Sequence, residues 1–161
     1  MSVKCRYDQW EPGTCSDAHV PAALLKQWLR ELYIPLIPGQ SIASSQAWTD
    51  IKIHVSDDTF YADAVRVGED ADLACSLVKR LPELHQVVLS FLIRFLQIFI
   101  SPDVVSITKM DASNLSMVFA PNFLRCPSKD PIVIMENTRK EMAFVKTLIH
   151  HLDTSAVEGL S

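Results

Sequence analysis

Few residues in this chain have the types and spacing that catalysis requires. Its 161 residues include only four glycines, and neither a Walker A loop nor a G-x-G-x-x-G turn can be written. G-x-S-x-G and H-E-x-x-H are also absent. His150 and His151 are adjacent, so a helix would turn their side chains about 100° apart instead of onto one metal. We therefore predict a chain that is not itself an enzyme and that has no metal site and no cofactor.

Two cations share one side of a predicted helix. Lys26 and Arg30 are four residues apart, hence about 40° around a helix, and point away from a stripe of leucines and Trp28. Such a pair is usually a solvated face, here with Glu31 nearby. Arg30 could alternatively form a bidentate pair with a carboxylate inside the domain. A contact surface for a partner is the functional interpretation.

Asn122 is the third polar residue of interest. It follows Pro121, and because proline removes a backbone donor, a helix is expected to stop near that residue. The prediction therefore places Asn122 just past a helix end, where its amide would pair with loose backbone groups. Asn114, earlier in the same stretch, is expected to brace its short helix.

The elements that must position these residues are all helical. Apolar residues recur at the 3.6-residue period in several segments bounded by proline or by an aspartate cap, and no strand pair is evident. About five helices and an all-α bundle are predicted. The expected helices cover about residues 20–33, a run through Leu73 to Leu81, a central core helix from Pro82 to Ser101, a helix from Asp111 to Pro121, and a last region from Asp130 with a break near Asn137.

Composition narrows the class of protein. With 48% hydrophobic and 21% charged residues the chain should fold as one domain, and its net charge of −4 disfavours a nucleic-acid partner. The longest apolar run, residues 87–100, is interrupted by polar residues and is shorter than the roughly 20 residues that cross a bilayer. The four cysteines form no C-x-x-C pair and are interpreted as reduced thiols, with disulfides as the alternative. A cytoplasmic location is expected.

Three ordered stretches resemble the signature blocks of the Rho-GAP family. The first, HVPAALLKQWLREL from His19 with PLIP from Pro35, is similar to V-A-x-L-L-K-x-[WYF]-L-R-E-L-P-x-P-L. The second, LPELH from Leu81, is similar to L-P-x-x-N followed by spaced leucines. The third, KMDASNLSMVFAPNFL from Lys109, is similar to N-K-M-x-x-x-N-L-A-x-V-F-A-P-N-L-L. Residues 136–142 and 151–155 further resemble the Vilse (CrossGAP) type.

The resemblance implies a helical bundle of the Rho-GAP type over residues 1–161. It implies a domain that binds a Rho-family small GTPase (Rac-, Cdc42- or Rho-like) in its GTP-bound state and promotes GTP hydrolysis in signal transduction. Such a domain regulates an enzyme, because the active site belongs to the bound GTPase. By the same resemblance Lys26 and Arg30 lie on the docking face, and Asn122 lies in the interface beside the nucleotide.

The sequence departs from the family pattern in three places. The family's catalytic arginine, worth about 10³ to 10⁵ in rate, sits in an upstream G-[IV]-[FY]-R loop. Arg6 lacks the glycine and the aromatic of that loop, so we assign no catalytic residue and expect the first helix and finger loop to be missing. Residues 41–59 look inserted, either as a surface loop or through a gene-model error. His85 replaces the family's asparagine.

Three functional hypotheses follow from these observations. The first is a GTPase-activating domain whose parent protein supplies the arginine. The second is a GTPase-binding module without activating function, because the arginine finger is absent. The third is a helical scaffold that makes no GTPase contact and keeps the blocks as core.

Overall fold

The computed structural model describes residues 19–38 and 60–157, and within them every regular element is helical. This confirms the predicted all-α class. The elements of these residues are α1 (His19–Glu31), α2 (Phe60–Val67), α3 (Ala71–Lys79), α4 (Glu83–Phe99), α5 (Pro102–Thr108), α6 (Ala112–Phe123), α7 (Pro131–His151) and the 3-10 turn η3 (Ser155–Val157). Arg6, the expected insertion at residues 41–59, Cys5 and Cys15 lie outside the described residues.

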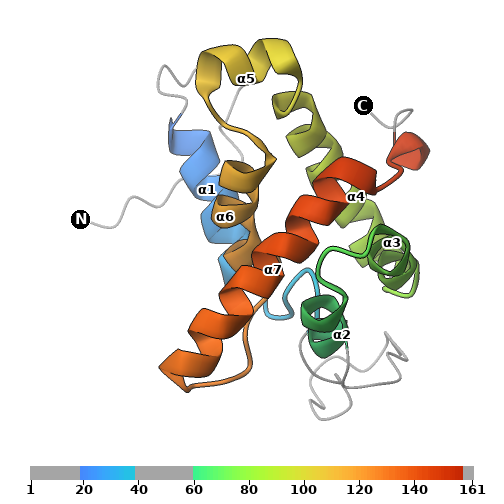
Figure 1. The fold of residues 1–161 in the computed structure, drawn as a ribbon, viewed down its shortest axis with the longest axis vertical. Coiled ribbons are helices and arrows are strands. Elements are labelled where there is room, and N and C mark those ends of the chain that lie inside the picture. The colour runs from blue at the N-terminus through green and yellow to red at the C-terminus, as the bar shows by residue number, and fades with distance from the viewer. Residues whose placement is uncertain (1–18, 39–59, 158–161) are drawn as a thin grey trace, which may run out of the picture.

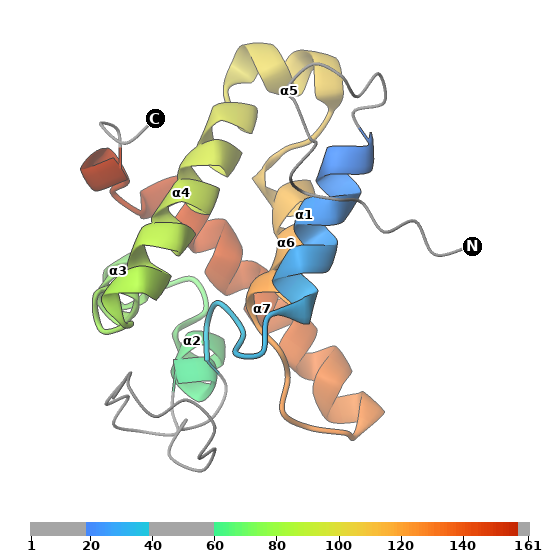
Figure 2. The same ribbon diagram turned by 180° about the vertical axis from the view of Figure 1, so that it is seen from behind.

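The long helix α7 is the centre of the arrangement. It crosses the molecule diagonally in Figure 1 and packs against α6, α2, α3 and α4. Helix α1 packs on α6, and the two lie side by side in both views (Figures 1 and 2). The short α5 joins α4 to α6 at one end of the bundle. Lys26 and Arg30 thus belong to a helix at the edge, beside the helix that carries Asn122.

Aspartate residues are the N-caps of three helices. Asp70, Asp111 and Asp130 each accept a hydrogen bond from a backbone N–H of the first turn, at 3.0, 2.8 and 2.9 Å. These bonds satisfy donors that have no partner inside the helix. The predicted caps of the last two helices are therefore confirmed, and Pro131 occupies the first turn of α7 as expected.

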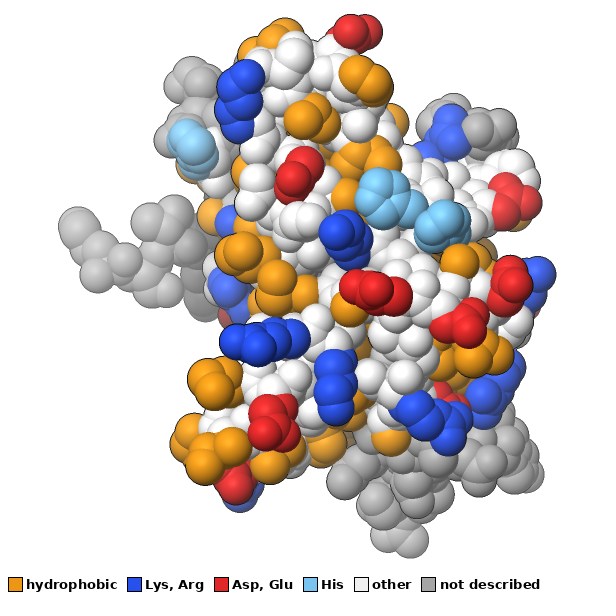
Figure 3. Space-filling model, in the orientation of Figure 1, with side chains coloured by type: hydrophobic (Ala, Val, Ile, Leu, Met, Phe, Trp, Pro, Cys, Tyr) orange, Lys and Arg blue, Asp and Glu red, His pale blue; other side chains and the backbone are white. Residues whose placement is uncertain are grey.

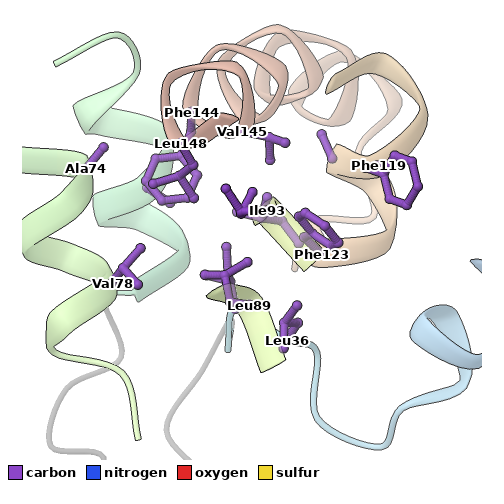
Figure 4. Packing of buried hydrophobic residues seen from close by; sticks show 14 of the residues in the cluster. Leu36, Ala74, Val78, Leu89, Ile93, Phe119, Phe123, Phe144, Val145 and Leu148 are labelled. Carbon is purple, nitrogen blue, oxygen red and sulfur yellow. The ribbon is translucent and has the colours of Figure 1, made fainter. Parts of the chain in front are cut away.

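The hydrophobic core forms where helices from distant parts of the chain meet. Figure 4 shows side chains from α3, α4, α6, α7 and the segment after α1 pointing toward one another. Phe123, Leu89, Ile93 and Val145 are fully buried there. Leu89, Ile93 and Leu96 of α4 are buried and recur at helical spacing, so α4 contributes one face to the core. The helix that most of the others pack against is α7 and not α4, which corrects the prediction that α4 is the central core helix.

Two short helices escaped the sequence analysis. Pro102 directly follows the predicted central helix, and it stands in the first turn of α5. The eight-residue α2 begins at Phe60, directly after residues 41–59. Helices of seven or eight residues span about two turns, so their apolar period is too short to recognise.

Helix α6 corrects the prediction that the chain leaves the helix near Pro121. The helix continues through Phe123, and the backbone N–H of Leu124 still donates to the carbonyl of Ala120 at 2.9 Å. Proline removes one backbone donor and crowds the carbonyl four residues earlier, but Phe123 beyond it is fully buried in the core. Burial near the helix end outweighs the loss of one hydrogen bond there.

Helix α7 is continuous, so the break considered near Asn137 is not present. Its first turns project beyond the bundle (Figure 1) and expose the apolar residues Ile132, Val133, Ile134 and Met135. They form the orange region at the lower left of Figure 3. Because these first turns project past the other described helices, they have no buried face. The apolar stripe of α7 therefore begins only at Met142.

No single helix of the described residues is long and apolar enough to span a membrane. Helices α4 and α5 reach a sufficient length and apolar composition only together, and the chain bends by 74° between them.

Candidate functional site

Helix α1 carries the two predicted cations. The Arg30 side chain is exposed and the Lys26 side chain is partly buried. The Arg30 guanidinium makes no hydrogen bond or ion pair with residues 19–38 and 60–157, so the alternative of an internal carboxylate partner is not observed there. The inner side of α1 is formed by Leu29, which is fully buried, with Leu25 and Leu32 beside it.

Trp28 was predicted to belong to the apolar stripe of this helix, but it is 44% exposed. With Leu32, Leu84 and Val88 it lines a shallow groove of about 260 Å³ between α1 and α4. The groove is apolar, and the polar side chain in its lining, His85, already places Nδ1 2.8 Å from the carbonyl oxygen of Leu36. That carbonyl can only accept, so His85 carries its proton on Nδ1. The groove therefore offers no catalytic group.

The carboxyl end of α1 is held by an arginine that the sequence analysis did not single out. Arg125, just after α6, donates from Nη2 to the carbonyl oxygens of Arg30 and Leu32, the latter at 2.6 Å. The same nitrogen lies 3.3 Å from the carbonyl oxygen of Leu29. Carbonyl groups at a helix end lack intrahelical donors, and a cation there also opposes the helix dipole. Arg125 is thus the C-terminal cap of α1.

Backbone contacts extend this junction into the next segment. The N–H of Ile37 donates to the carbonyl of Phe123 at 2.9 Å, and Leu36 is held by His85 of α4 as described above. The chain after α1 is therefore pinned between the end of α6 and the start of α4. As a result, the last turns of α1 and α6, which carry Arg30 and Asn122, lie at one junction.

Asn122 itself differs from the prediction. It lies inside the last turn of α6, not beyond it, and its side chain is only 3% exposed. Nδ2 donates to the carbonyl of Val118 at 2.6 Å, one helical turn back. Oδ1 is buried and has no hydrogen-bond partner within the described part of the chain. The structure brings Asn122 to the same junction as Arg30 but does not display its side chain on the surface beside Lys26.

Asn114 braces the start of α6, as expected. Its Nδ2 donates to the carbonyl of Lys109 at 3.0 Å. Lys109 has a positive φ of 58° at the end of α5, a conformation that non-glycine residues adopt infrequently. Asn114 therefore stabilises the turn that connects α5 to α6.

A buried polar cluster lies next to the junction. The Tyr61 hydroxyl donates to the Glu141 carboxylate, and the Nδ2 of Asn137 lies 3.5 Å from the sulfur of Cys126. Burial raises the pKa of Glu141, and burial together with hydrogen bonds to Cys126 and Glu141 raises the pKa of Tyr61. The cluster joins α2, α7 and the segment after α6. Neither Cys75 nor Cys126 is in a disulfide.

The surface charge shows no concentration of one sign on the face formed by α7. Basic and acidic side chains are interspersed there in Figure 3. Among the described residues no group of three or more His, Cys, Asp or Glu side chains could hold a metal ion. The rings of His150 and His151 lie 6.1 Å apart, centroid to centroid.

Comparison with known proteins bears on the three signature blocks. The model of the RhoGAP domain matches residues 2–128. The chain is similar to the GTPase activating protein homolog 2 of Dictyostelium discoideum, with 40% identity over 136 residues, or 84% of this chain. It is also similar to the human Rho GTPase-activating protein 24, with 32% identity over 127 residues, or 76% of this chain.

These relatives are much longer than the matched region. The alignment covers 13% of the Dictyostelium protein and 15% of the human one. Rho GTPase-activating protein 22 of Mus musculus is 32% identical over 140 residues, which is 86% of this chain and 17% of that protein. In each of these relatives the match thus concerns one region of a longer protein.

Proposed function

Because the chain belongs to the RhoGAP domain family, we propose that it binds a Rho-family small GTPase in its GTP-bound state, in the cytoplasm, and promotes hydrolysis of the GTP. The observation that carries this proposal is the match over residues 2–128, which includes both α1 and α6. The chain regulates an enzyme. In this proposal the reacting nucleotide and the attacking water are held in the active site of the bound GTPase.

The chemistry of the reaction explains what a regulator of this kind has to supply. In phosphoryl transfer the transition state spreads negative charge over oxygen atoms, and catalysis depends on positioning and on opposing charge. We assign Lys26 and Arg30 to the contact surface, because both are cations of α1, Arg30 exposed and Lys26 partly buried one turn earlier. The guanidinium of Arg30 has no partner among the described residues, so its donors are available to a GTPase.

Asn122 has a different part in the proposed interface. Its Oδ1 is buried without a hydrogen-bond partner in the described residues, and an unpaired buried acceptor carries a desolvation cost. A donor that reached the end of α6 would remove this cost. Since the side chain is 3% exposed, the approach has to displace the side chains that cover Asn122.

Titration of the chain into Rac-like and Rho-like GTPases, loaded with a non-hydrolysable GTP analogue, tests binding. Saturable binding is expected with at least one GTPase, and Lys26→Ala and Arg30→Ala should each weaken it by about 5- to 10-fold, as for a lost charged contact. Added salt should weaken binding of the wild type more than that of Lys26→Ala. Loss of salt sensitivity separates a charged contact from a general packing effect.

Matched controls come from α2 and α3, which pack against each other and against α7. Arg66→Ala and Lys79→Ala remove exposed cations from those helices, and both variants should bind as the wild type does. The proposed interface would be contradicted if Lys26→Ala, Arg30→Ala and Asn122→Ala all bound the GTPase as tightly as these controls.

Single-turnover GTP hydrolysis tests the second half of the proposal. The same GTPases are loaded with GTP and mixed with the chain, and in parallel with a version of the chain extended upstream to include a finger loop. Acceleration by either protein supports the activating function. Binding without acceleration by either would leave only a GTPase-binding role.

A further inference from the structure

We propose that Arg125 is a positioning residue for GTPase binding. Its guanidinium fixes the last turn of α1, and with it the side chain of Arg30, against the end of α6. The inference rests on the proposed function and adds a residue that does not itself touch the GTPase. Three backbone carbonyl groups meet one nitrogen of this side chain, as described above.

The first step of the argument is that Arg125 extends from an anchored stretch of chain. Leu124 is 1% exposed, and its N–H is bonded to the carbonyl of Ala120. On the other side, Cys126 contacts Asn137 of α7 and interacts with Tyr61 of α2. The backbone of Arg125 is thus held by core contacts on both sides. Its side chain connects this anchored segment to the end of α1.

The second step concerns the geometry of the donor. Nη2 has two hydrogens and faces three acceptors, so one N–H is shared between two carbonyl oxygens. A planar guanidinium holds such an arrangement with little loss of side-chain entropy. Residues 29–32 therefore have a fixed backbone position relative to α6, although they lie more than 90 residues away in the sequence.

The third step connects this clamp to the surface. The carbonyl of Arg30 is bonded to Arg125, whereas the guanidinium of Arg30 is exposed and unpartnered within the described residues. The backbone of the contact residue is held while its side chain remains available, which lowers the entropy that binding would otherwise cost. Lys26 lies one turn earlier, outside the clamped residues, so it should depend less on Arg125.

The test is a double-mutant cycle on binding. Arg125→Gln and Arg30→Ala are made singly and together, and affinity is measured for a Rac-like GTPase that holds a non-hydrolysable GTP analogue. Arg125→Gln should weaken binding by no more than the roughly 5- to 10-fold expected for Arg30→Ala, because Arg125 acts on the GTPase only through Arg30. In the Arg125→Gln background, Arg30→Ala should cause less than about a twofold further loss, because the positioned contact is already gone.

Two further variants distinguish positioning from general stability. Arg66→Gln makes the same chemical change on α2, where the arginine pairs with Asp63, and should leave both the affinity and the Arg30→Ala effect unchanged. Arg125→Lys keeps the charge and a donor, so it should bind better than Arg125→Gln. Where circular dichroism shows that the glutamine variant is unfolded, the cycle is built on Arg125→Lys.

The possible results separate this inference from the proposed function. If Arg30→Ala weakens binding by the same factor with and without Arg125, the positioning role is overturned while GTPase binding stands. If the cycle with Lys26→Ala is more strongly coupled than the one with Arg30→Ala, the clamp does not act through the last turn of α1. If the wild-type chain binds no GTPase, the proposed function and the positioning role both fail.

Discussion

The hydroxyl of Tyr61 in α2 donates a hydrogen bond to the carboxylate of Glu141 in α7, and both residues are at most 4% exposed. The two residues are 80 positions apart in the sequence. A buried carboxylate is costly unless it is paired, so this hydrogen bond determines how α2 can dock on α7. The bond also lies beside Cys126, one residue from the clamp on α1.

Tyr61→Phe should destabilise the fold by about 2 to 3 kcal/mol, because it leaves the Glu141 carboxylate buried without its donor. The free energy of unfolding is measured in urea. Tyr33→Phe is the control: Tyr33 is 78% exposed, so its loss of a hydroxyl should have little effect. Tyr61→Phe combined with Glu141→Leu should recover part of the stability, since both polar partners are then removed. No recovery would show that the pair is not the source of the effect.

Stability should fall as the pH rises above the ordinary pKa of a glutamate, 4.5, through the raised pKa of Glu141. Burial raises this pKa, and the Tyr61 hydrogen bond opposes the rise only in part. In that window the folded chain holds a proton that the unfolded chain has released, so the contribution is present below the unfolded pKa and lost above the folded one. Glu141→Gln keeps an acceptor for Tyr61 but cannot ionise.

The measurement for this pH effect is the difference in unfolding free energy between Glu141→Gln and the wild type, from about pH 4 to pH 7. The difference should move in favour of the glutamine variant as the pH rises. A constant difference over the whole range would mean that Glu141 titrates alike in the folded and unfolded chains.

His85→Ala should cost about 1 kcal/mol, because it removes the donor to the Leu36 carbonyl. His85→Asn should cost less, since an asparagine amide can also donate to a carbonyl at this position. Thermal unfolding of the three proteins gives the comparison. Equal loss in both variants would indicate that packing of the ring beside Leu36, and not the hydrogen bond, holds the segment after α1.

Gly68→Ala should destabilise the chain by about 1 to 2 kcal/mol through backbone conformation alone. Gly68 has a φ of 55° at the end of α2, and a Cβ built there would meet no atom within 4 Å. Gly68→Asn should cost less, because asparagine tolerates this conformation better than alanine. Urea unfolding separates the two variants. If alanine and asparagine have the same effect, the positive φ is not what selects glycine at this turn.

The likeness in the three sequence blocks predicted both the family and the helical class. The comparisons and the structure confirm those two points. The narrower likeness to the Vilse type, the missing finger loop and the insertion at residues 41–59 stay predictions. The roles of Lys26, Arg30 and Asn122 are also still to be tested by the binding experiments.

The sequence by itself determined where the long helices form, because a helix depends on neighbours within a few residues. Asp111, Asp130 and Pro131 mark helix starts through contacts within three positions, and the apolar period of α4 repeats within each turn. Those signals are local and can be recognised without knowledge of the fold.

Only the tertiary structure decided which polar side chains are available. In the folded chain Asn122 is buried, Trp28 is exposed and α6 continues past Pro121. Arg125 contacts a helix end 95 residues away. Residues so far apart meet only after the helices pack, and packing depends on the sum of many apolar contacts that no short pattern records. For that reason the sequence predicted that Lys26 and Arg30 share one helix, whereas the contact of Arg125 with the end of that helix appeared only in the folded chain.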